Sequence, residues 1–568
     1  MAESNKILSK RSLRRHVKNT EAVVATLQSI NRNTYNTFVE DSNTAVLLME
    51  VDSCDSDAGG DWFRATSGQE DMSATSGQEE NTKSDYYSSD EQDEDSDIDD
   101  SNTDNLCDDL RAWAAATNTP LSHLSSLLTV LRKHLPNANL PKDGRTLLST
   151  PTSTEVQSKA GGSMHYFGVA NGIKSRIEDS PTLKSIHTLR LQINVDGMPL
   201  FKSSNEQFWP ILALIEEDPN RIPFVVALYS GQSKPSDANE YLSDFVMEME
   251  RIASDGVVYQ SKLYKVEISA FVCDAPARAF IKNIKSHNSY YGCERCAQEG
   301  VWSNNRMNYP ETNAASRTDE SFKAQLHSDH HRDGESALIR INIGMVSQFV
   351  LDFMHLVCLG VMRKLRLWMR GPLPSRIGNQ SMTAVSDKLV LLGKKLPKEF
   401  GRKGRSLREV DRWKATEFRT FLLYTGPIAL KNTLPDAMYN HFLLLHVGIT
   451  ILCSTHLSEH YCDYAEKVLT VFVQNFSVIY GDFVVYNVHG LIHLANDVRK
   501  FGPLPKISAF PFENYLYQLK RKISKPNQPL QQIVKRLTEQ PLNISSVSQS
   551  QHTNVLCAKP PSMHCPVL

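Results

Sequence analysis

The chain has 568 residues, of which 40% are hydrophobic and 22% are charged, a composition that is ordinary for a soluble globular protein with several domains. The N-terminus is polar and basic, and no uncharged apolar run reaches bilayer length, so we expect no signal peptide, no membrane-spanning helix and an intracellular protein. The ten scattered cysteines are then thiols or metal ligands rather than a disulfide framework.

The net charge of −2 hides a strong segregation of charge along the chain. Residues 79–109 hold fourteen acidic residues against one lysine, a net charge of −13, which leaves +11 on the rest of the chain. A surplus of that size favours a polyanionic partner. The alternative is a cationic surface that is merely solvated.

The first part of the chain is expected to lack a folded core. Lys10–Lys18 has five Lys and Arg in nine residues, typical of a nuclear address or of an arm that contacts phosphates. Residues 41–107 are rich in Ser, Asp, Gly and Thr, and the sequence ATSGQE occurs twice among them. This segment has too few apolar residues for burial to offset the entropy of the chain. We predict a basic arm over 1–40 and a disordered acidic linker over 41–107.

Ordered structure is predicted to begin near Asp108. Apolar residues at helical spacing over 110–135, with a break at 118–120, predict a helical hairpin that serves packing. Gly161–Gly172 is rich in glycine but has no phosphate-cradling spacing, so we expect a connector there and no nucleotide site. Hairpin and connector together span 108–180.

Residues 181–300 change to a strand pattern. Three alternating runs predict an antiparallel meander, and an amphipathic helix with an acidic first turn and a further strand follow them. The first strand delivers Asp196 to a turn at its end, and the last strand ends in Asp274 in the same way. The predicted elements are the strands 187–201, 203–217 and 222–231, the helix Asp237–Ile252 and the strand Tyr264–Cys273.

A third acidic residue, Glu513, lies at the start of a basic helix, with 238 residues between it and Asp274. Two carboxylates at strand ends and one on a helix can converge on a divalent cation, and Mg²⁺ or Mn²⁺ prefers such oxygen ligands. For an isolated Asp at a strand end the alternative is a cap or turn residue.

The long stretch between these acids predicts a mainly α-helical region over 301–485, because apolar segments of helical length recur in it. Within it, Arg402–Arg419 has seven basic residues around Trp413, which indicates either a groove for the DNA backbone or a solvated helix pair. Residues 486–540 carry an H-x-x-x-H motif and the Glu513 helix. The Ser-, Gln- and Pro-rich tail over 541–568 is predicted to be disordered.

A second group of candidate metal ligands combines C-x-x-C at Cys293 and Cys296 with H-x-x-x-H at His489 and His493. Alone, the cysteines fit a redox pair and the histidines fit core or capping residues. Together they match a Cys₂His₂ zinc set, because histidines four apart share one helix face and C-x-x-C forms a tight turn, which Gly292 suits. No Glu follows the first His, which argues against a metalloprotease.

A third motif places Asp352 and His355 three residues apart. On a helix the two side chains lie on one side, so Asp352 can orient His355 toward a site. The alternative is a hydrogen-bonded pair at a helix start.

Six stretches, in order along the chain from about Asp108 to Gln540, resemble transposases of the CACTA (En/Spm) class of cut-and-paste DNA elements. The six stretches are NVDGMPLFKSS, CDAPARAFIKNIKSHNSYYGCERC, LDFMHLVCLGVMRKL, RWKATEFRTFLLYTGP, NVHGLIHLANDV and FPFENYLYQLKRKISKPNQPLQQIVKR.

The resemblance implies an α/β fold, in which a large α-helical insertion over 301–485 interrupts a ribonuclease-H-like catalytic domain. It makes Asp196, Asp274 and Glu513 a DDE triad that holds two Mg²⁺ or Mn²⁺ ions, and it gives His355 a place near the scissile phosphate or the flanking strand. It also implies structural Zn²⁺ at the Cys₂His₂ set. The implied protein is a nuclear DNA transposase that cleaves phosphodiesters, transfers strands and acts as a homo-oligomer on double-stranded DNA.

Two departures from the pattern keep alternatives open. The segment before the catalytic domain has no zinc-finger or helix-turn-helix signature, and the chain stops soon after the Glu513 helix, which fits a truncated or host-adopted copy. One alternative is therefore a transposase-derived, non-catalytic DNA-binding or regulatory protein. Another, a zinc-organised scaffold, requires that the three acids do not converge.

Overall fold

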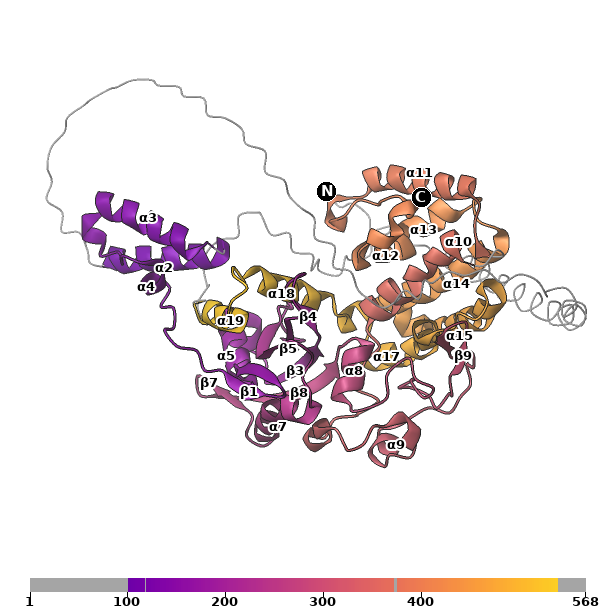
Figure 1. The fold of residues 1–568 in the computed structure, drawn as a ribbon, viewed down its shortest axis with the longest axis horizontal. Coiled ribbons are helices and arrows are strands. Elements are labelled where there is room, and N and C mark those ends of the chain that lie inside the picture. The colour runs from indigo at the N-terminus through magenta and orange to yellow at the C-terminus, as the bar shows by residue number, and fades with distance from the viewer. Residues whose placement is uncertain (1–100, 118, 372–374, 540–568) are drawn as a thin grey trace, which may run out of the picture. The chain divides into compact units, whose positions relative to one another are not determined.

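The computed structural model describes residues 101–117, 119–371 and 375–539, which fall into two compact units, residues 101–148 and residues 149–539 (Figure 1). The predicted basic arm over 1–40, the predicted linker up to residue 100 and the predicted tail over 541–568 lie outside the described residues.

The smaller unit is the predicted helical hairpin, with α2 (Ser101–Thr117), α3 (Leu121–His134) and a short α4 (Gly144–Leu147). Its core is formed by Ala114, Leu124, Leu128, Ala138, Leu140, Leu147 and Leu148. Helix α2 begins at Ser101, so the linker boundary predicted at residue 107 is wrong for its last residues. Leu106 packs against this core, and acidic residues suit a helix start, which together explain the earlier beginning.

The larger unit is built on one mixed sheet of eight strands with the order β1-β2-β6-β5-β3-β8-β7, in which β4 pairs with β5. The strands are β1 (Gln157–Lys159), β2 (Gly162–Tyr166), β3 (Thr188–Val195), β4 (Met198–Pro199), β5 (Gln207–Ile215), β6 (Phe224–Gly231), β7 (Val257–Tyr259) and β8 (Lys262–Phe271). The predicted meander is confirmed, because β3, β5 and β6 pair antiparallel in sequence order. Strand β8 pairs parallel to β3.

The predicted connector over Gly161–Gly172 is wrong, because it contains β2 and the start of α5 (Val169–Asp179). Strand β2 pairs with β6, and a Cβ at Gly162 would lie 2.5 Å from the Ser230 carbonyl oxygen and from the Tyr229 ring. The glycine therefore permits close packing of two strands. A short helix, α6 (Pro181–Lys184), leads from α5 into β3.

The parallel pair of β3 and β8 brings two predicted acids to one edge of the sheet. Helix α7 (Ala238–Asp255) makes the connection, and Ile193 on β3 aligns with Phe271 on β8. Asp196 and Asp274 each lie three residues beyond this aligned pair. Neighbouring strands lie about 4.8 Å apart, so the two chain segments leave the sheet side by side. Helix α8 (Ala275–Ile281) begins directly after Asp274.

Both faces of the sheet are covered, as the burial of successive β5 residues shows. Trp209, Ile211 and Ala213 face one core with α5 and α7, whereas Phe208 and Leu212 belong to a second core shared with the helices that follow residue 350. The alternation follows from the period of two along a strand.

The region from 301 onward is mainly helical, as predicted, although it opens with a small β-hairpin of β9 (Val301–Ser303) and β10 (Arg306–Asn308). Its α-helices are α9 (Asp319–Lys323), α10 (Arg366–Arg370), α11 (Asn379–Lys395), α12 (Ala415–Thr420), α13 (Gly426–Leu430), α14 (Asp436–Cys453), α15 (Thr455–Tyr480), α16 (Tyr486–His489), α17 (Leu494–Phe501), α18 (Phe510–Arg521) and α19 (Pro529–Thr538). Two π-helical turns, η5 (Met354–Val361) and η10 (Phe421–Thr425), interrupt the regular pattern.

Helix α14 is the one helix among the described residues that is long and apolar enough to cross a membrane by length and composition. It packs along α15, and its buried residues, among them Phe442, Leu445 and Ile449, belong to the second core. This burial explains the composition of α14 as that of a core helix.

The chain returns to the sheet at its C-terminal end, where α18 and α19 lie beside the strands (Figure 1). The carbonyl of Lys506 accepts a hydrogen bond from Gln192 of β3 at 2.9 Å, and the Lys520 ammonium donates to the Pro199 carbonyl at 2.8 Å. Phe512 and Leu516 pack into the second core. These contacts place the first turn of α18, which carries Glu513, next to the end of β3.

Candidate metal centres

Three of the predicted site residues meet at the end of β3. Asp196 follows that strand directly, His355 lies in η5, and Glu513 lies in the first turn of α18. One ligand atom from each lies within 4.8 Å of the other two. The His355 side chain is 25% exposed and that of Glu513 is 41% exposed. The cluster is therefore open to solvent on one side, as a site that receives an outside molecule must be.

Asp274, the fourth predicted site residue, is not part of this close group. Its Oδ1 accepts a hydrogen bond from the Ala277 amide at 2.8 Å and so caps the start of α8. The cap occupies one carboxylate oxygen only. Asp274 still lies near Asp196, because its charge is one of the causes that raise the Asp196 pKa. The structure therefore places Asp274 at the rim of the cluster, with a structural bond of its own.

Burial, and then the charges of neighbouring carboxylates, shift the pKa values of the cluster. Burial raises the pKa of Asp196 well above its usual range, and the charges of Asp274 and Glu513 raise it further. Burial would also raise the pKa of Glu513, but the interactions with His355 and Asp196 together outweigh burial and lower it. Burial and the neighbouring carboxylates therefore both disfavour the charged form of Asp196.

Asp352 contacts His355 at the start of η5, where it also accepts the Met354 and His355 amides, so the pair fits both predicted alternatives. The Nδ1 of His355 lies 2.6 Å from Asp352 Oδ2, and its Nε2 lies 3.6 Å from Glu513 Oε1. Burial lowers the pKa of His355, but hydrogen bonds to Asp352 and Glu513 dominate and raise it well above the usual value. Asp352 also accepts the Ala509 amide at 2.7 Å, so one buried carboxylate positions both His355 and the start of α18.

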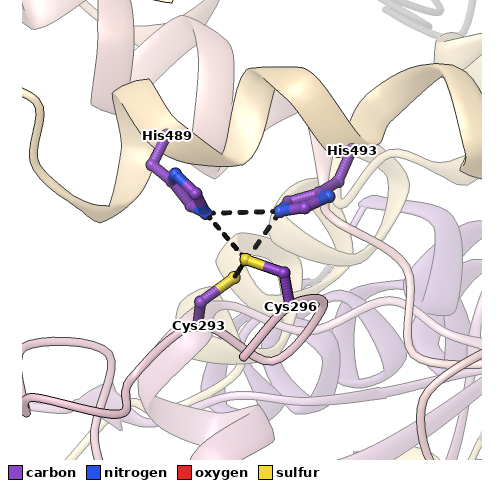
Figure 2. Close-up of side chains that lie close together, drawn as sticks. All are labelled: Cys293, Cys296, His489 and His493. Carbon is purple, nitrogen blue, oxygen red and sulfur yellow. Dashed lines mark hydrogen bonds between the residues drawn. The ribbon is translucent and has the colours of Figure 1, made fainter. Parts of the chain in front are cut away.

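The second predicted group comes together completely, as Figure 2 shows. The two sulfurs, Cys293 and Cys296, lie 3.5 Å apart, and the Nε2 atoms of His489 and His493 lie 3.3 Å apart. The two sulfur to nitrogen distances are 3.2 and 3.6 Å. A tetrahedral zinc ion with Zn–S near about 2.3 Å and Zn–N near about 2.0–2.1 Å requires edges of about 3.3–3.8 Å. The predicted convergence is confirmed.

The protonation of this centre suits a metal ion. His489 Nδ1 donates to the Tyr309 carbonyl at 3.1 Å, which leaves the lone pair of Nε2 directed at the sulfurs. Burial would raise the pKa of Cys293, but the hydrogen bond from Cys296 and the two imidazoles lower it well below the usual value. The hydrogen bond to Cys293, and then burial, raise the pKa of Cys296. The opposite shifts mean that Cys293 gives up its proton more readily than Cys296, and metal binding requires deprotonated cysteines.

Gly292 allows the turn before Cys293 to pack closely. A Cβ at this position would lie 2.5 Å from the Tyr309 hydroxyl and 2.7 Å from the Ser286 carbonyl oxygen. The same hydroxyl donates to the carbonyls of His287 and Ser289, at 2.9 and 2.5 Å. The cysteine turn is thus held against Tyr309, whose own carbonyl orients His489.

The two residues between the cysteines form a buried charge network that the sequence prediction missed. Glu294 accepts hydrogen bonds from Arg278 at 2.7 Å, Lys282 at 2.9 Å and Tyr486 at 2.7 Å. Burial alone would raise the pKa of Glu294, but the charges of Arg278 and Lys282 hold it far below its usual value. Arg295 pairs with Asp497 at 2.8 Å. The network joins the cysteine turn to α8, α16 and α17.

Arg278 connects the two centres through the backbone. Besides Glu294, its guanidinium donates to the carbonyl of Cys273 at 2.5 Å and to the carbonyl of Val350 at 3.2 Å. Cys273 precedes Asp274, and Val350 lies two residues before Asp352. Asp497, the partner of Arg295, also accepts the Leu351 amide at 2.8 Å. The same buried ionic contacts therefore hold both the cysteine turn and the backbone next to Asp274 and Asp352.

The basic stretch Arg402–Arg419 does not present its tryptophan to solvent. Trp413 is buried in the second core and donates to the Ser406 carbonyl at 3.2 Å. Arg405 pairs with Glu417 at 2.7 Å, so part of the positive charge is used internally. The stretch folds as part of a packed helical layer, and Trp413 is not placed to stack on a nucleic-acid base.

Comparison of the chain with protein-family models and with curated proteins finds no match.

Proposed function

We propose that the protein is a DDE-type DNA transposase, a metal-dependent enzyme that cleaves phosphodiesters and transfers strands. The observation that carries the proposal is the convergence of Asp196, Glu513 and His355 within 4.8 Å, from segments far apart in the sequence, at the sheet edge where Asp274 also lies. The order of three antiparallel strands, a helix and a parallel strand supports a ribonuclease-H-like catalytic domain that the helical region interrupts.

The residues of the cluster fit a divalent cation. Carboxylate oxygens are the ligands that Mg²⁺ or Mn²⁺ prefers, and the raised pKa of Asp196 marks a place where positive charge is needed. Asp196, Asp274 and Glu513 would hold the metal, which supplies activation of a water or a DNA 3′-hydroxyl and stabilises the leaving oxygen. In our proposal, the protonated His355 contributes a fixed cation beside the carboxylates, so it can neutralise a phosphate oxygen there.

The Cys₂His₂ group fits structural zinc. All four ligand atoms come from the protein, the two sulfurs and His489 are buried, and the edges match a tetrahedral ion. A closed site of this kind has no position for a substrate. We propose that zinc here holds the cysteine turn after α8 to the segment that leads into α18.

A cluster of cations supports a polyanionic substrate. Lys364 follows the helical segment that carries His355, and burial together with the charges of Arg306 and Arg366 lowers its pKa to about 8. Arg366 pairs with Asp411, whereas neither Arg363 nor Lys364 makes an ion pair with a described residue. These cations lie just beyond η5 in the sequence, and a phosphate backbone is the partner that such a group of cations favours.

The alternative of a non-catalytic, DNA-binding or regulatory protein also has one observation in its favour. Asp274 caps α8 and stands outside the close group, as expected if that residue had only a structural role. Under this alternative, DNA binding persists, and no metal-dependent cleavage occurs.

The test incubates the purified chain and Mg²⁺ with a labelled duplex that contains the DNA flanking its own gene. We expect nicking at an element end that requires the metal and is absent in Asp196→Asn, while both proteins bind the duplex equally. DNA binding without nicking at any metal concentration would contradict catalysis and favour the alternative.

A further inference from the structure

We infer a second transition-metal site, exposed at the start of α15 and formed by His456, Glu459 and His460. One ligand atom from each lies within 4.8 Å of the other two, and all three residues are exposed. This group shares no residue with the acid cluster or with the Cys₂His₂ centre. The inference does not depend on the proposed function.

The local helix places the three ligands together. The Ser454 hydroxyl accepts the Leu457 amide at 3.3 Å and caps α15, so His456 lies in its first turn. Residues three and four apart share a helix face, which aligns Glu459 and His460 with His456. The two imidazole centroids are 5.0 Å apart with the rings tilted by 58°. Neither ring has to leave the helix surface to reach a common ion.

Hydrogen bonding leaves the ligand atoms available. His460 Nδ1 donates to the His456 carbonyl at 2.9 Å, so the lone pair of its Nε2 points outward, in the same arrangement that orients His489. Among the described residues, Glu459 has no ion-pair partner. Asp463, one turn further on, is held by Arg499 at 2.5 Å and remains outside the group.

The donor set selects the class of metal. Two imidazoles and one carboxylate suit borderline ions such as Zn²⁺, Ni²⁺ and Cu²⁺, whereas Mg²⁺ and Ca²⁺ prefer all-oxygen ligands. Three protein ligands leave at least one coordination position to water. The ion at α15 is therefore exchangeable and binds more weakly than an ion in the buried Cys₂His₂ centre.

The test titrates the full chain with Zn²⁺ against a chromophoric chelator, with excess Mg²⁺ present to occupy the acid cluster. We expect the double variant His456→Gln/His460→Gln to bind one equivalent fewer than the wild type. Glu459→Gln should keep that equivalent but bind it at least about tenfold more weakly, since even changes beside a metal ligand cost 10–100-fold. His123→Gln, at an exposed position on α3, is the matched control and should change nothing.

Cobalt distinguishes the two sites. Co²⁺ in the Cys₂His₂ centre gives a sulfur-to-metal absorption in the near ultraviolet, and Co²⁺ at α15 has no sulfur ligand. The double variant should keep the full sulfur band while losing one equivalent of bound Co²⁺. An unchanged stoichiometry in the double variant, or an unchanged affinity in Glu459→Gln, would overturn the three-ligand site.

Discussion

The Cys₂His₂ centre and the acid cluster are both assembled from distant parts of the chain, but their side chains match the geometry of a metal site to different degrees. At the first, all four ligand atoms already lie at tetrahedral distances, and a buried network holds the turn between them. At the second, the carboxylates repel one another, part of the site faces solvent, and Asp274 is engaged as a cap. The difference fits our proposal of a structural ion at the first and a catalytic one at the second, since only a catalytic ion must admit a substrate.

The largest effect should follow from opening the closed centre. Cys293→Ser or His493→Ala should lower the free energy of unfolding by at least about 5 kcal/mol, because zinc supplies roughly 10–16 kcal/mol in small zinc-finger peptides. Urea unfolding with and without a strong chelator measures this. The chelator should destabilise the wild type and leave the variants unchanged. Cys462→Ser, outside the centre, serves as the control, and a wild type without bound zinc would contradict the assignment.

The acid cluster should respond in the opposite way, losing activity without losing stability. Asp196→Asn and Glu513→Gln remove metal ligands and relieve repulsion, so cleavage of DNA should fall by more than about a thousandfold, or roughly 4 kcal/mol, while the melting temperature stays equal or rises. Cleavage assays and thermal unfolding of the same preparations test both halves. Retained cleavage in either variant would remove that residue from the catalytic set.

Asp274 allows its two roles to be separated. Asn caps a helix about as well as Asp does, whereas Ala costs about 1 kcal/mol at that position. Asp274→Asn should therefore abolish cleavage and preserve stability, if the residue is a metal ligand. Full activity in Asp274→Asn, with lower stability in Asp274→Ala, would leave Asp274 as a cap only.

The network between the centres should show an intermediate effect. Arg278→Gln leaves Glu294 buried without its main partner, and breaking a buried pair from one side costs about 3–5 kcal/mol. Arg340→Gln breaks an exposed pair with Glu250 and should cost less than about 1 kcal/mol. Equal losses of unfolding free energy in the two variants would contradict the role given to the buried network.

The buried residue His441 in the helical core should make the free energy of unfolding depend on pH, independently of both centres. Burial lowers the pKa of His441 to about 4, so this residue is neutral in the folded protein and charges on unfolding. Because its folded pKa lies below the unfolded value near 6.5, stability is lost as pH falls below 6.5. Between pH 7 and pH 5 the loss is about 2 kcal/mol. In His441→Gln this loss of about 2 kcal/mol should be absent. If the free energy of unfolding depends on pH in the same way in the variant and the wild type, His441 is not its cause.

The smallest effect concerns Lys364 and the DNA substrate that we propose. If Lys364 contacts one phosphate, Lys364→Gln should weaken binding of duplex DNA about eightfold at 0.1 M salt and reduce the salt slope by about 0.9. Lys323→Gln, at an exposed position on α9, is the control. Equal affinity and slope in both variants would exclude this phosphate contact.

The two centres also differ in how many of their residues, and of the roles of these residues, could be predicted from the sequence. C-x-x-C and H-x-x-x-H have spacings that let each pair share one ion, so all four residues of the group could be identified. Asp196 and Asp274 could be placed at strand ends because alternation marks β3 and β8, but whether a strand-end Asp also caps the next helix depends on backbone amides that the sequence does not display.

The features that could not be predicted involve residues whose burial or packing differs from what is usual for their type. Arg278, Glu294 and Asp497 are charged residues in buried positions, which composition assigns to the surface. Gly162 indicated a loop, although it serves a strand that packs against Tyr229. The stretch around Trp413 indicated either a DNA groove or a solvated helix pair, although Trp413 belongs to the core. In each case long-range packing outweighs the local signal.

The most direct test of the central claim is anomalous diffraction from crystals of the protein grown with Mn²⁺. We expect an anomalous peak bound by the carboxylates of Asp196 and Glu513, with Asp274 contributing its oxygen that does not cap α8. No manganese at this cluster, in crystals whose Cys₂His₂ centre contains zinc, would contradict the account of the acid cluster as a catalytic metal site.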